Sequence, residues 1–388
     1  MIIKNGNLVT PTATVRSDIR ISDGRIVEIG NCLSDNETFD AEGLYVCPGL
    51  VDIHTHGGFG GDFMDSNEEA IGRVLDFHSK YGTTSLLATT VTAPVDRIEK
   101  MIKTVRKYRD DGKDRSCRIL GIHLEGPYLS LKNKGAQSEK YLKIPSRDSF
   151  DFILRNKDII KTVTLSPELE GACEMTRQLR KSGIVVCGGH DDGERRKILP
   201  VIEAGLSHCT HLWCAMSTVA IRDGIRDIGL FELGLLDDRL TVELIADGHH
   251  ITPEMVKLVY KCKGADKICL VSDSLRAGGM PQDGRIYTLG DERDETAQRF
   301  VVSDGVAKLP DHSRFAGSIQ PISQMVKNIV LGTDIPLFEA IRMASLNPAR
   351  VIGLDGEVGS IEVGKRADIC IMDKELNVVG TMVGGKIL

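Results

Sequence analysis

The chain has 388 residues, of which 41% are hydrophobic and 27% are charged, a composition that excludes a disordered or fibrous protein. Its length accommodates a barrel of about 250 residues together with a smaller module. The formal net charge of -6 comes from interspersed acidic and basic residues, which excludes a broad basic surface for nucleic acid.

The first residues, MIIKNGNLVT, place a lysine and an Asn-Gly turn where a secretory signal needs an apolar core. No later apolar run reaches the length of about 18 residues that would span a membrane. We therefore expect a cytoplasmic protein with no membrane partner. Its cysteines are scattered and form no CxxC pair, so we expect reduced thiols.

Short strands joined by tight turns are predicted at both ends of the chain. Asn-Gly at Asn5 and Asp-Gly at Asp23 stand between alternating apolar residues, which indicates hairpins. The segment from Gly359 to Val383 has a similar pattern. Because short strands cannot bury a face alone, we expect residues 1–48 and 350–388 to form one small β-sandwich domain.

Between these ends, short apolar runs alternate with helical segments, which is typical of parallel β/α units. Eight candidate strands begin near Leu50, Thr84, Ile119, Thr162, Ile184, Leu206, Thr241 and Ile268. They predict an α/β fold, a (β/α)8 TIM barrel over residues 49–349. Alternating segments at about residues 276–314 interrupt this pattern, and we expect a β-hairpin insertion there.

Potential metal ligands follow the predicted strands at the end where a barrel places its active site. They are His54 and His56 after the first strand, Glu125 after the third, His190 after the fifth, His211 after the sixth and Asp273 after the eighth. Alternate residues of a strand share a face, so the His-x-His spacing directs both imidazoles to one side. Imidazole with carboxylate indicates a first-row divalent ion rather than Ca²⁺ or Mg²⁺.

Other ionisable residues allow competing interpretations. His123 and His208 are expected to support ligands rather than to bind the metal. His78 and His312 are expected to be structural or exposed, and Asp247 suits a turn as well as catalysis. A ligand at each of five strand ends favours a functional site over scattered core histidines.

A family resemblance is carried by PGLVDIHTHG from Pro48, GIHLEGPY from Gly121, THLWCAM from Thr210, IADGHH from Ile245, LVSDS from Leu270, AGS from Ala316 and NPAR from Asn347. In these segments the chain resembles the amidohydrolase superfamily and, within it, the N-acetylglucosamine-6-phosphate deacetylases or a paralogue with a shifted substrate. The similarity spans nearly the whole chain. It implies a metal-dependent hydrolase of carbon–nitrogen bonds that acts in amino sugar metabolism.

The resemblance implies one or two divalent ions, with zinc expected and iron, cobalt or manganese as alternatives. The ligands it implies for the main ion are Glu125, His190 and His211. A second ion would use His54 and His56, with Glu125 and Asp273 as further ligands. Asp273 resembles the catalytic acid/base, and His250 resembles the histidine that contacts the substrate and polarises the reacting group.

The substrate-binding residues implied by the resemblance are Gln137, Cys214, Ala215, Met216, Arg222, His250 and Ser318. Gln137 stands where family members usually carry His, and Cys214 stands where they carry Asn. Arg222 aligns with a phosphate-binding Arg of an Arg-Glu-Pro-Gly-like motif, although no Pro follows here. In the family this Arg reaches the neighbouring subunit's site, so a homodimer is expected.

We therefore expect hydrolysis of an N-acetylhexosamine 6-phosphate, foremost N-acetylglucosamine 6-phosphate, to acetate and the amino sugar phosphate. The alternatives are N-acetylgalactosamine 6-phosphate or another N-acyl compound, such as an N-acyl amino acid, which the changes at Gln137 and Cys214 permit. A barrel retained only as a binding or scaffold protein would lose its ligands or its base, and this sequence keeps both.

Overall fold

The computed structural model describes residues 1–222 and 224–388, with the side chain of Arg222 outside the description. Its central element is a sheet of eight parallel strands in the order β17-β16-β13-β12-β11-β10-β9-β6. These strands are β6 (Leu50–Thr55), β9 (Thr83–Thr89), β10 (Arg118–Glu125), β11 (Ile160–Leu165), β12 (Val185–Gly188), β13 (Leu206–Cys209), β16 (Thr241–Leu244) and β17 (Ile268–Leu270). All eight predicted strands are present, in the predicted order.

The two edge strands of this sheet, β6 and β17, are connected by hydrogen bonds just after the end of β17. The Asp273 N–H donates to the His54 carbonyl at 2.9 Å, and the His56 N–H donates to the Ser274 carbonyl at 2.9 Å. These bonds join the end of β6 to the segment that follows β17, so the strands form a barrel-like domain. Because all eight strands are parallel, their carboxyl ends gather at one rim.

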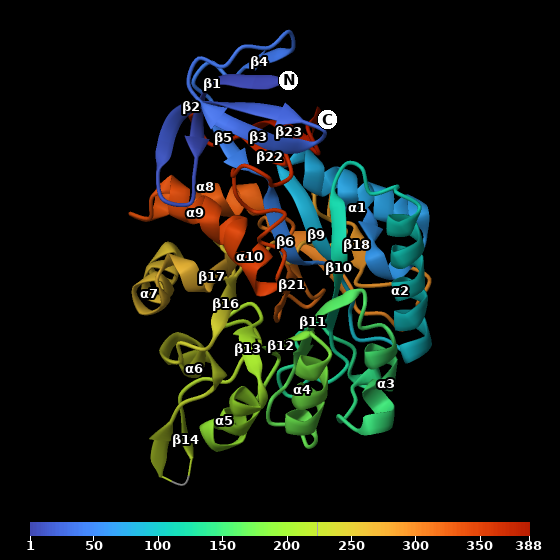
Figure 1. The fold of residues 1–388 in the computed structure, drawn as a ribbon. Coiled ribbons are helices and arrows are strands. Elements are labelled where there is room, and N and C mark those ends of the chain that lie inside the picture. Colours follow the sequence, from blue (N-terminus) through green and yellow to red (C-terminus); the bar gives the residue numbers. More distant parts are fainter. Residues whose placement is uncertain (223) are drawn as a thin grey trace.

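Helices surround the barrel, as Figure 1 shows. They are α1 (Glu68–Lys80), α2 (Val95–Asp110), α3 (Arg147–Arg155), α4 (Ala172–Lys181), α5 (Arg195–Ala204), α6 (Leu230–Leu236), α7 (Pro253–Lys263), α8 (Ile322–Gly332), α9 (Leu337–Ala344) and α10 (Leu346–Val351). The sequence specifies where α1 begins, because the Asn67 side chain caps the helix by accepting a hydrogen bond from the Ala70 N–H. Ile71, Val74 and Leu75 then fall on its buried face. None of the described helices could cross a membrane.

Strands from both ends of the chain form a second sheet, at the top of Figure 1. They are β1 (Ile2–Val9), β2 (Thr14–Ser22), β3 (Arg25–Gly30), β4 (Thr38–Asp40), β5 (Tyr45–Pro48), β22 (Ile369–Met372), β23 (Val378–Val383) and β24 (Lys386–Ile387). The sheet curls, because the Ile26 N–H donates to Lys365 and the Ala367 N–H donates to Gly24. It encloses an apolar cluster, including Ile19, that is separate from the barrel core.

The segment after β17 contains a four-stranded antiparallel sheet where the sequence predicted a two-stranded hairpin. Its strands are β18 (Ile286–Thr288), β19 (Arg299–Ser303), β20 (Val306–Lys308) and β21 (Phe315–Gly317). Buried Arg276 anchors it by donating to the Thr288 carbonyl at 2.8 Å and pairing with Asp65 at 2.9 Å. The Ser318 N–H donates to the Asp273 carbonyl at 2.9 Å, so β21 returns to the rim.

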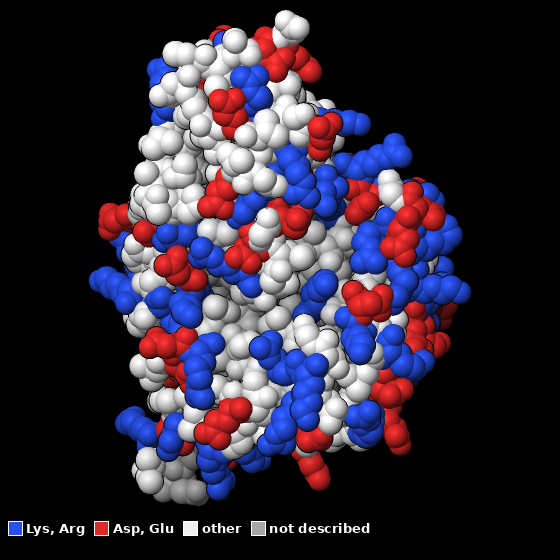
Figure 2. Space-filling model, in the orientation of Figure 1, with Lys and Arg blue, Asp and Glu red and all other residues white. Residues whose placement is uncertain are grey.

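The remaining short elements are β7 (Gly57–Gly58), β8 (Gly61–Asp62), β14 (Ala220–Arg222), β15 (Ile225–Asp227) and the 3-10 turns η1 (Phe63–Asp65), η2 (Glu139–Tyr141) and η3 (Ala265–Lys267). On the face shown in Figure 2, acidic and basic side chains are interspersed. The visible surface therefore lacks the single-sign patch expected of a nucleic-acid interface.

Candidate metal centre and active site

Glu125, His190 and His211 lie together at the ends of β10, β12 and β13. The Glu125 Oε1 atom is 3.1 Å from Nε2 of His190 and 3.1 Å from Nε2 of His211, and these two nitrogens are 3.2 Å apart. Ligand atoms about 2.1 Å from a tetrahedral ion would be roughly 3.4 Å from one another. The spacing of these three atoms therefore fits a shared cation.

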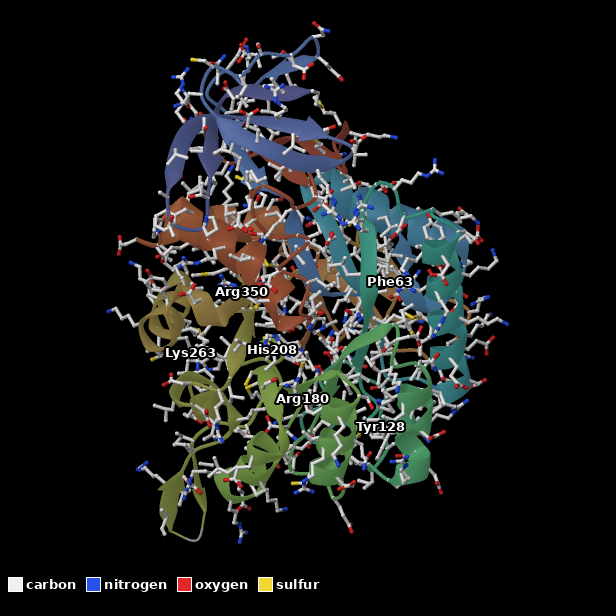
Figure 3. The ribbon with its side chains drawn as sticks, in the orientation of Figure 1. Phe63, Tyr128, Arg180, His208, Lys263 and Arg350 are labelled. Atoms are coloured by element: carbon white, nitrogen blue, oxygen red, sulfur yellow. The ribbon has the colours of Figure 1, made fainter. Side chains whose placement is uncertain are left out.

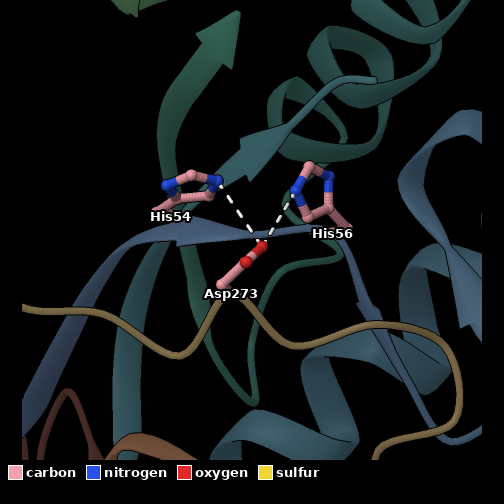
Figure 4. A group of neighbouring side chains, drawn as sticks. All are labelled: His54, His56 and Asp273. Atoms are coloured by element: carbon pink, nitrogen blue, oxygen red, sulfur yellow. Dashed lines mark ion pairs between the residues drawn. The ribbon is translucent and has the colours of Figure 1, made fainter. Parts of the chain in front are cut away.

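His54 and His56 complete the cluster on the side of β6. Nε2 of His56 lies 3.2 Å from Asp273 Oδ1 and 3.4 Å from Glu125 Oε2. Nε2 of His54 lies 3.6 Å from Asp273 Oδ1 and 3.5 Å from Glu125 Oε1, and it has no hydrogen-bond partner among the described atoms. Figure 4 shows both imidazoles directed at the Asp273 carboxylate. All six predicted ligands thus meet in one group.

The protonation of the ring nitrogens also suits a metal. The Nδ1 atom of His190 donates to the Asn133 carbonyl at 2.9 Å, and Nδ1 of His54 lies 3.0 Å from the Glu243 carboxylate. A neutral imidazole that donates through Nδ1 presents the lone pair of Nε2. In this tautomer both Nε2 atoms face the cluster and could coordinate an ion.

The electrostatics of the cluster favour positive charge. Burial lowers the pKa of His56, but the Asp273 and Glu125 carboxylates outweigh it and raise this pKa to about 9. Burial would raise the pKa of Glu125, yet the neighbouring histidines hold it well below its usual value. Without a metal, the negative carboxylates are thus balanced by protonated imidazole, and a divalent cation could supply the same positive charge.

Three of these residues have backbone conformations that are rare outside glycine. The φ angles are 50° at His190, 26° at His211 and 44° at Asp273. Each such conformation costs on the order of 1–3 kcal/mol. Hydrogen bonds hold it in place, for example from the Ser130 N–H to the His190 carbonyl at 2.9 Å. Strain of this kind is characteristic of functional sites.

Glu243 on β16 supports the cluster, a role that the sequence pattern did not predict. Its Oε2 atom lies 3.0 Å from His54 Nδ1 and accepts from the His211 N–H at 3.0 Å. Its Oε1 atom lies 3.2 Å from Nε2 of His208, which is labelled in Figure 3. His208 is therefore a supporting residue. The clue in the sequence was a carboxylate inside an otherwise apolar strand.

Two other histidines are structural. Burial lowers the pKa of His123 well below its usual value, and its Nε2 lies 2.8 Å from the Thr164 hydroxyl. Burial also lowers the pKa of His78 to about 3, and its Nε2 lies 2.9 Å from the Thr55 hydroxyl. Both imidazoles are neutral, and each connects two neighbouring elements: His123 connects β10 to β11, and His78 connects α1 to β6. His312, by contrast, is exposed.

His250 lies at the cavity wall and is oriented by Asp247. One Asp247 oxygen accepts the N–H groups of His249 and His250 at 2.9 Å each, and the other lies 2.8 Å from His250 Nδ1. Asp247 therefore serves both as a turn residue and as a partner of the imidazole. The Nε2 atom of His250 remains available to a bound molecule.

A cavity of about 440 Å³ opens above the cluster, a size that suits a small-molecule ligand. Its lining includes Asp273 and, of the predicted substrate residues, Gln137, Cys214, Ala215 and His250. Met216 and Ser318 are buried and do not appear in the lining, and Arg222 ends β14 with its side chain outside the described part.

Gln137 has a role at the cluster itself. Its side-chain amide donates to Glu125 Oε2 at 2.7 Å and accepts from the Thr92 N–H at 2.7 Å. Both ends of the amide are thus engaged by the protein. Gln137 fixes the orientation of the Glu125 carboxylate and also forms part of the cavity wall.

Comparisons with known proteins agree with this geometry. The amidohydrolase family model matches residues 45–388. An N-acetylglucosamine-6-phosphate deacetylase of Vibrio furnissii is 34% identical, with 88% of this chain and 82% of the relative covered. An N-acetylgalactosamine-6-phosphate deacetylase of Escherichia coli O157:H7 is also 34% identical, with 95% and 94% covered.

The same similarity is found in three dimensions. The crystal structure of N-acetylglucosamine-6-phosphate deacetylase from Pasteurella multocida has a TM-score of 0.91 and 30% sequence identity, with 100% of this chain and 99% of that chain covered. The family model and these relatives extend over nearly the whole sequence. The chain belongs to the amidohydrolase family, and it is a hydrolase related to the N-acetylhexosamine-6-phosphate deacetylases.

Proposed function

We propose that this protein hydrolyses the acetamide group of an N-acetylhexosamine 6-phosphate to acetate and the amino sugar phosphate. The observation that carries the proposal is the position of Asp273, which lines the cavity and lies 3.2 Å from His56 Nε2 in the ligand cluster. A carboxylate in this position can exchange protons with water and with the nitrogen of a bound amide. The names of the relatives supply the substrate class.

We assign the main ion to Glu125, His190 and His211, and a second ion to His54 and His56 with Glu125 and Asp273. Zinc suits this set of imidazoles and carboxylates, and iron, cobalt and manganese are alternatives. When bound, the ion supplies Lewis acidity, which lowers the pKa of water and polarises an amide carbonyl.

The side chains then have separate tasks. Asp273 accepts the proton of the water that attacks the acetyl carbon, and it returns this proton to the amide nitrogen as the carbon–nitrogen bond breaks. The transfer is needed because an amine is a poor leaving group as an anion. Asp247 holds the His250 imidazole at the cavity wall, where its Nε2 atom can form a hydrogen bond with the developing oxyanion.

The chain organisation that accompanies this function is also a proposal. Residues 49–349 would form the barrel domain, with its insertion at about 276–314. Residues 1–48 and 350–388 would form the small β-sandwich domain, which the separate apolar core of the terminal sheet supports. We further propose a cytoplasmic homodimer, in which Arg222 reaches the cavity of the neighbouring subunit.

Acetate release from a panel of substrates tests the function. The purified protein, with its metal content measured by elemental analysis, is given N-acetylglucosamine 6-phosphate, N-acetylgalactosamine 6-phosphate, the two sugars without phosphate, and an N-acetyl amino acid. We expect equal amounts of acetate and free amine, with kcat/KM highest for a phosphorylated sugar. Turnover only of unphosphorylated sugars or of the amino acid would contradict the proposal.

A further inference from the structure

Arg314 lies at the wall of the cavity, directly before β21. Among the described residues that line this cavity, it is the only lysine or arginine. The family resemblance implies phosphate binding by Arg222 and gives Arg314 no role. We propose that Arg314, supplied by the same subunit as the metal ligands, binds the phosphate of the substrate and determines specificity for it. This inference rests on the proposed function.

The course of β21 connects Arg314 to the reacting centre. Ser318, at the far end of this segment, pairs with Ser274 and donates its N–H to the Asp273 carbonyl at 2.9 Å. An extended chain rises about 3.3 Å per residue, so the backbone of Arg314 lies at most roughly 13 Å from that of Ser318. Arg314 and Asp273 also line the same cavity, so a hexose with the acetamide at one end and the phosphate at the other can contact both residues.

Phe315 connects the same segment to His250. Their ring centroids are 5.0 Å apart, with an angle of 53° between the ring planes. Arg314 is therefore next in sequence to a residue that packs on the proposed substrate-contacting histidine. A sugar that reaches from Asp273 past His250 would arrive at Arg314.

The guanidinium of Arg314 is available for a ligand. Its carbonyl accepts from the Leu309 N–H at 2.9 Å, which fixes the backbone. Its exposed side chain has no ion pair or hydrogen bond with a described residue. By contrast, Arg276 in the same insertion is buried and fully engaged by Asp65 and Thr288. The nearby Lys134 ammonium donates to the Gln137 carbonyl at 3.3 Å.

The charges along the cavity define one orientation for the substrate. The floor contains the carboxylates of Glu125 and Asp273, and much of the wall is apolar, including Trp213, Met255 and Leu289. A phosphate group would therefore be placed away from the carboxylates and against Arg314. A guanidinium binds phosphate through two parallel, charge-assisted hydrogen bonds. The neutral hydroxyl of an unphosphorylated sugar cannot form such a pair.

Variants of Arg314 test the inference through the selectivity for phosphate. The measured quantity is the ratio of kcat/KM for N-acetylglucosamine 6-phosphate to kcat/KM for N-acetylglucosamine, with the same ratio for the galactosamine pair. We expect Arg314→Gln to lower this ratio roughly 10- to 100-fold, mainly through KM, because charge-assisted bonds to one phosphate are lost. Arg314→Lys should recover part of the ratio, since it restores the charge without the planar fork.

Arg285→Gln is the matched control, because Arg285 lies in the same insertion, pairs with Asp283 at the surface and does not line the cavity. It should leave the ratio within twofold of the wild-type value. An unchanged ratio in Arg314→Gln, with an active wild-type enzyme, would overturn the role of Arg314 and leave the proposed function intact. A wild-type protein that hydrolyses no phosphorylated sugar would overturn both.

Discussion

The floor and the wall of the cavity differ in how their polar groups are used. On the floor, each carboxylate faces more than one imidazole, as Glu125 does with His190 and His211. On the wall, apolar residues separate a few polar groups, of which His250 and Arg314 come from different segments of the chain. A change in the floor should therefore disturb hydrolysis of every substrate, whereas a change in the wall should alter which substrate is preferred.

The largest effect is expected at the floor from Asp273→Asn. The amide cannot take a proton from water, so kcat should fall roughly 10²- to 10⁴-fold for all substrates. The ion held by Glu125, His190 and His211 should remain, which elemental analysis can show. Asp304→Asn, at an exposed turn of the insertion, is the control. Loss of less than tenfold in kcat would contradict the acid/base role.

A smaller effect is expected from Glu243→Gln, which removes the charge beneath the ligands. An amide can bond His54 and His208 less well than a carboxylate, so the metal affinity should fall about 10- to 100-fold. Competition with a chelator measures this affinity, and Glu203→Gln on the exposed side of α5 is the control. An unchanged affinity would mean that Glu243 only fills space between β13 and β16.

The support of the floor also predicts a pH dependence of stability. The folded protein keeps His78 neutral with a pKa of about 3, while the unfolded chain takes up a proton below a pKa near 6.5. The unfolded state therefore binds more protons, and stability falls as pH falls. Between pH 7 and pH 5 this amounts to roughly 2 kcal/mol.

Comparison with His78→Gln isolates this contribution. Asp52, whose pKa burial raises to about 7, has the opposite pH dependence, but it is present in both proteins. The difference in unfolding free energy between wild type and variant, measured by denaturant titration, should thus shrink towards pH 5. A difference that is constant over this range would show that His78 titrates alike in both states.

The smallest effect is expected at the wall from Cys214→Asn, which introduces the residue usual in the resembling family. A side-chain amide offers one new neutral hydrogen bond to a sugar hydroxyl, worth roughly a two- to tenfold gain in kcat/KM for the preferred sugar phosphate. Metal content should not change. Equal gains for sugars and an N-acetyl amino acid would argue against a specific contact. They would also contradict the expectation that a change in the wall alters which substrate is preferred.

The strands and the ligand cluster could be predicted because both depend on local patterns. Apolar runs define the strands, and parallel strands must bring their carboxyl ends to one rim, so His54 and His211 were expected to meet. The sequence-based strand starts deviate little from the observed ones, as at Leu206 and Thr241. The structural roles of His78 and His208 followed from the same reasoning.

Contacts between distant segments could not be predicted in this way. Glu243 and His54 are 189 positions apart, and nothing in either strand alone specifies their pairing. Gln137 was assigned to the substrate, but its amide is held between Glu125 and the Thr92 backbone. The insertion was expected as two strands and has four, because β20 and β21, of three residues each, are too short to stand out before their partners are known.

The hydrogen bond between the Asp273 N–H and the His54 carbonyl places a proposed ligand and the proposed acid/base at the seam of the barrel. His54 belongs to β6, the first barrel strand, and Asp273 follows β17, the last one, so this bond joins the two ends of the strand order. An ion bound by both His54 and Asp273 would therefore link the two ends of the barrel sheet. Metal loading should then slow the opening of this seam, so that hydrogen exchange at β6 and β17 reports on metal occupancy without any substrate.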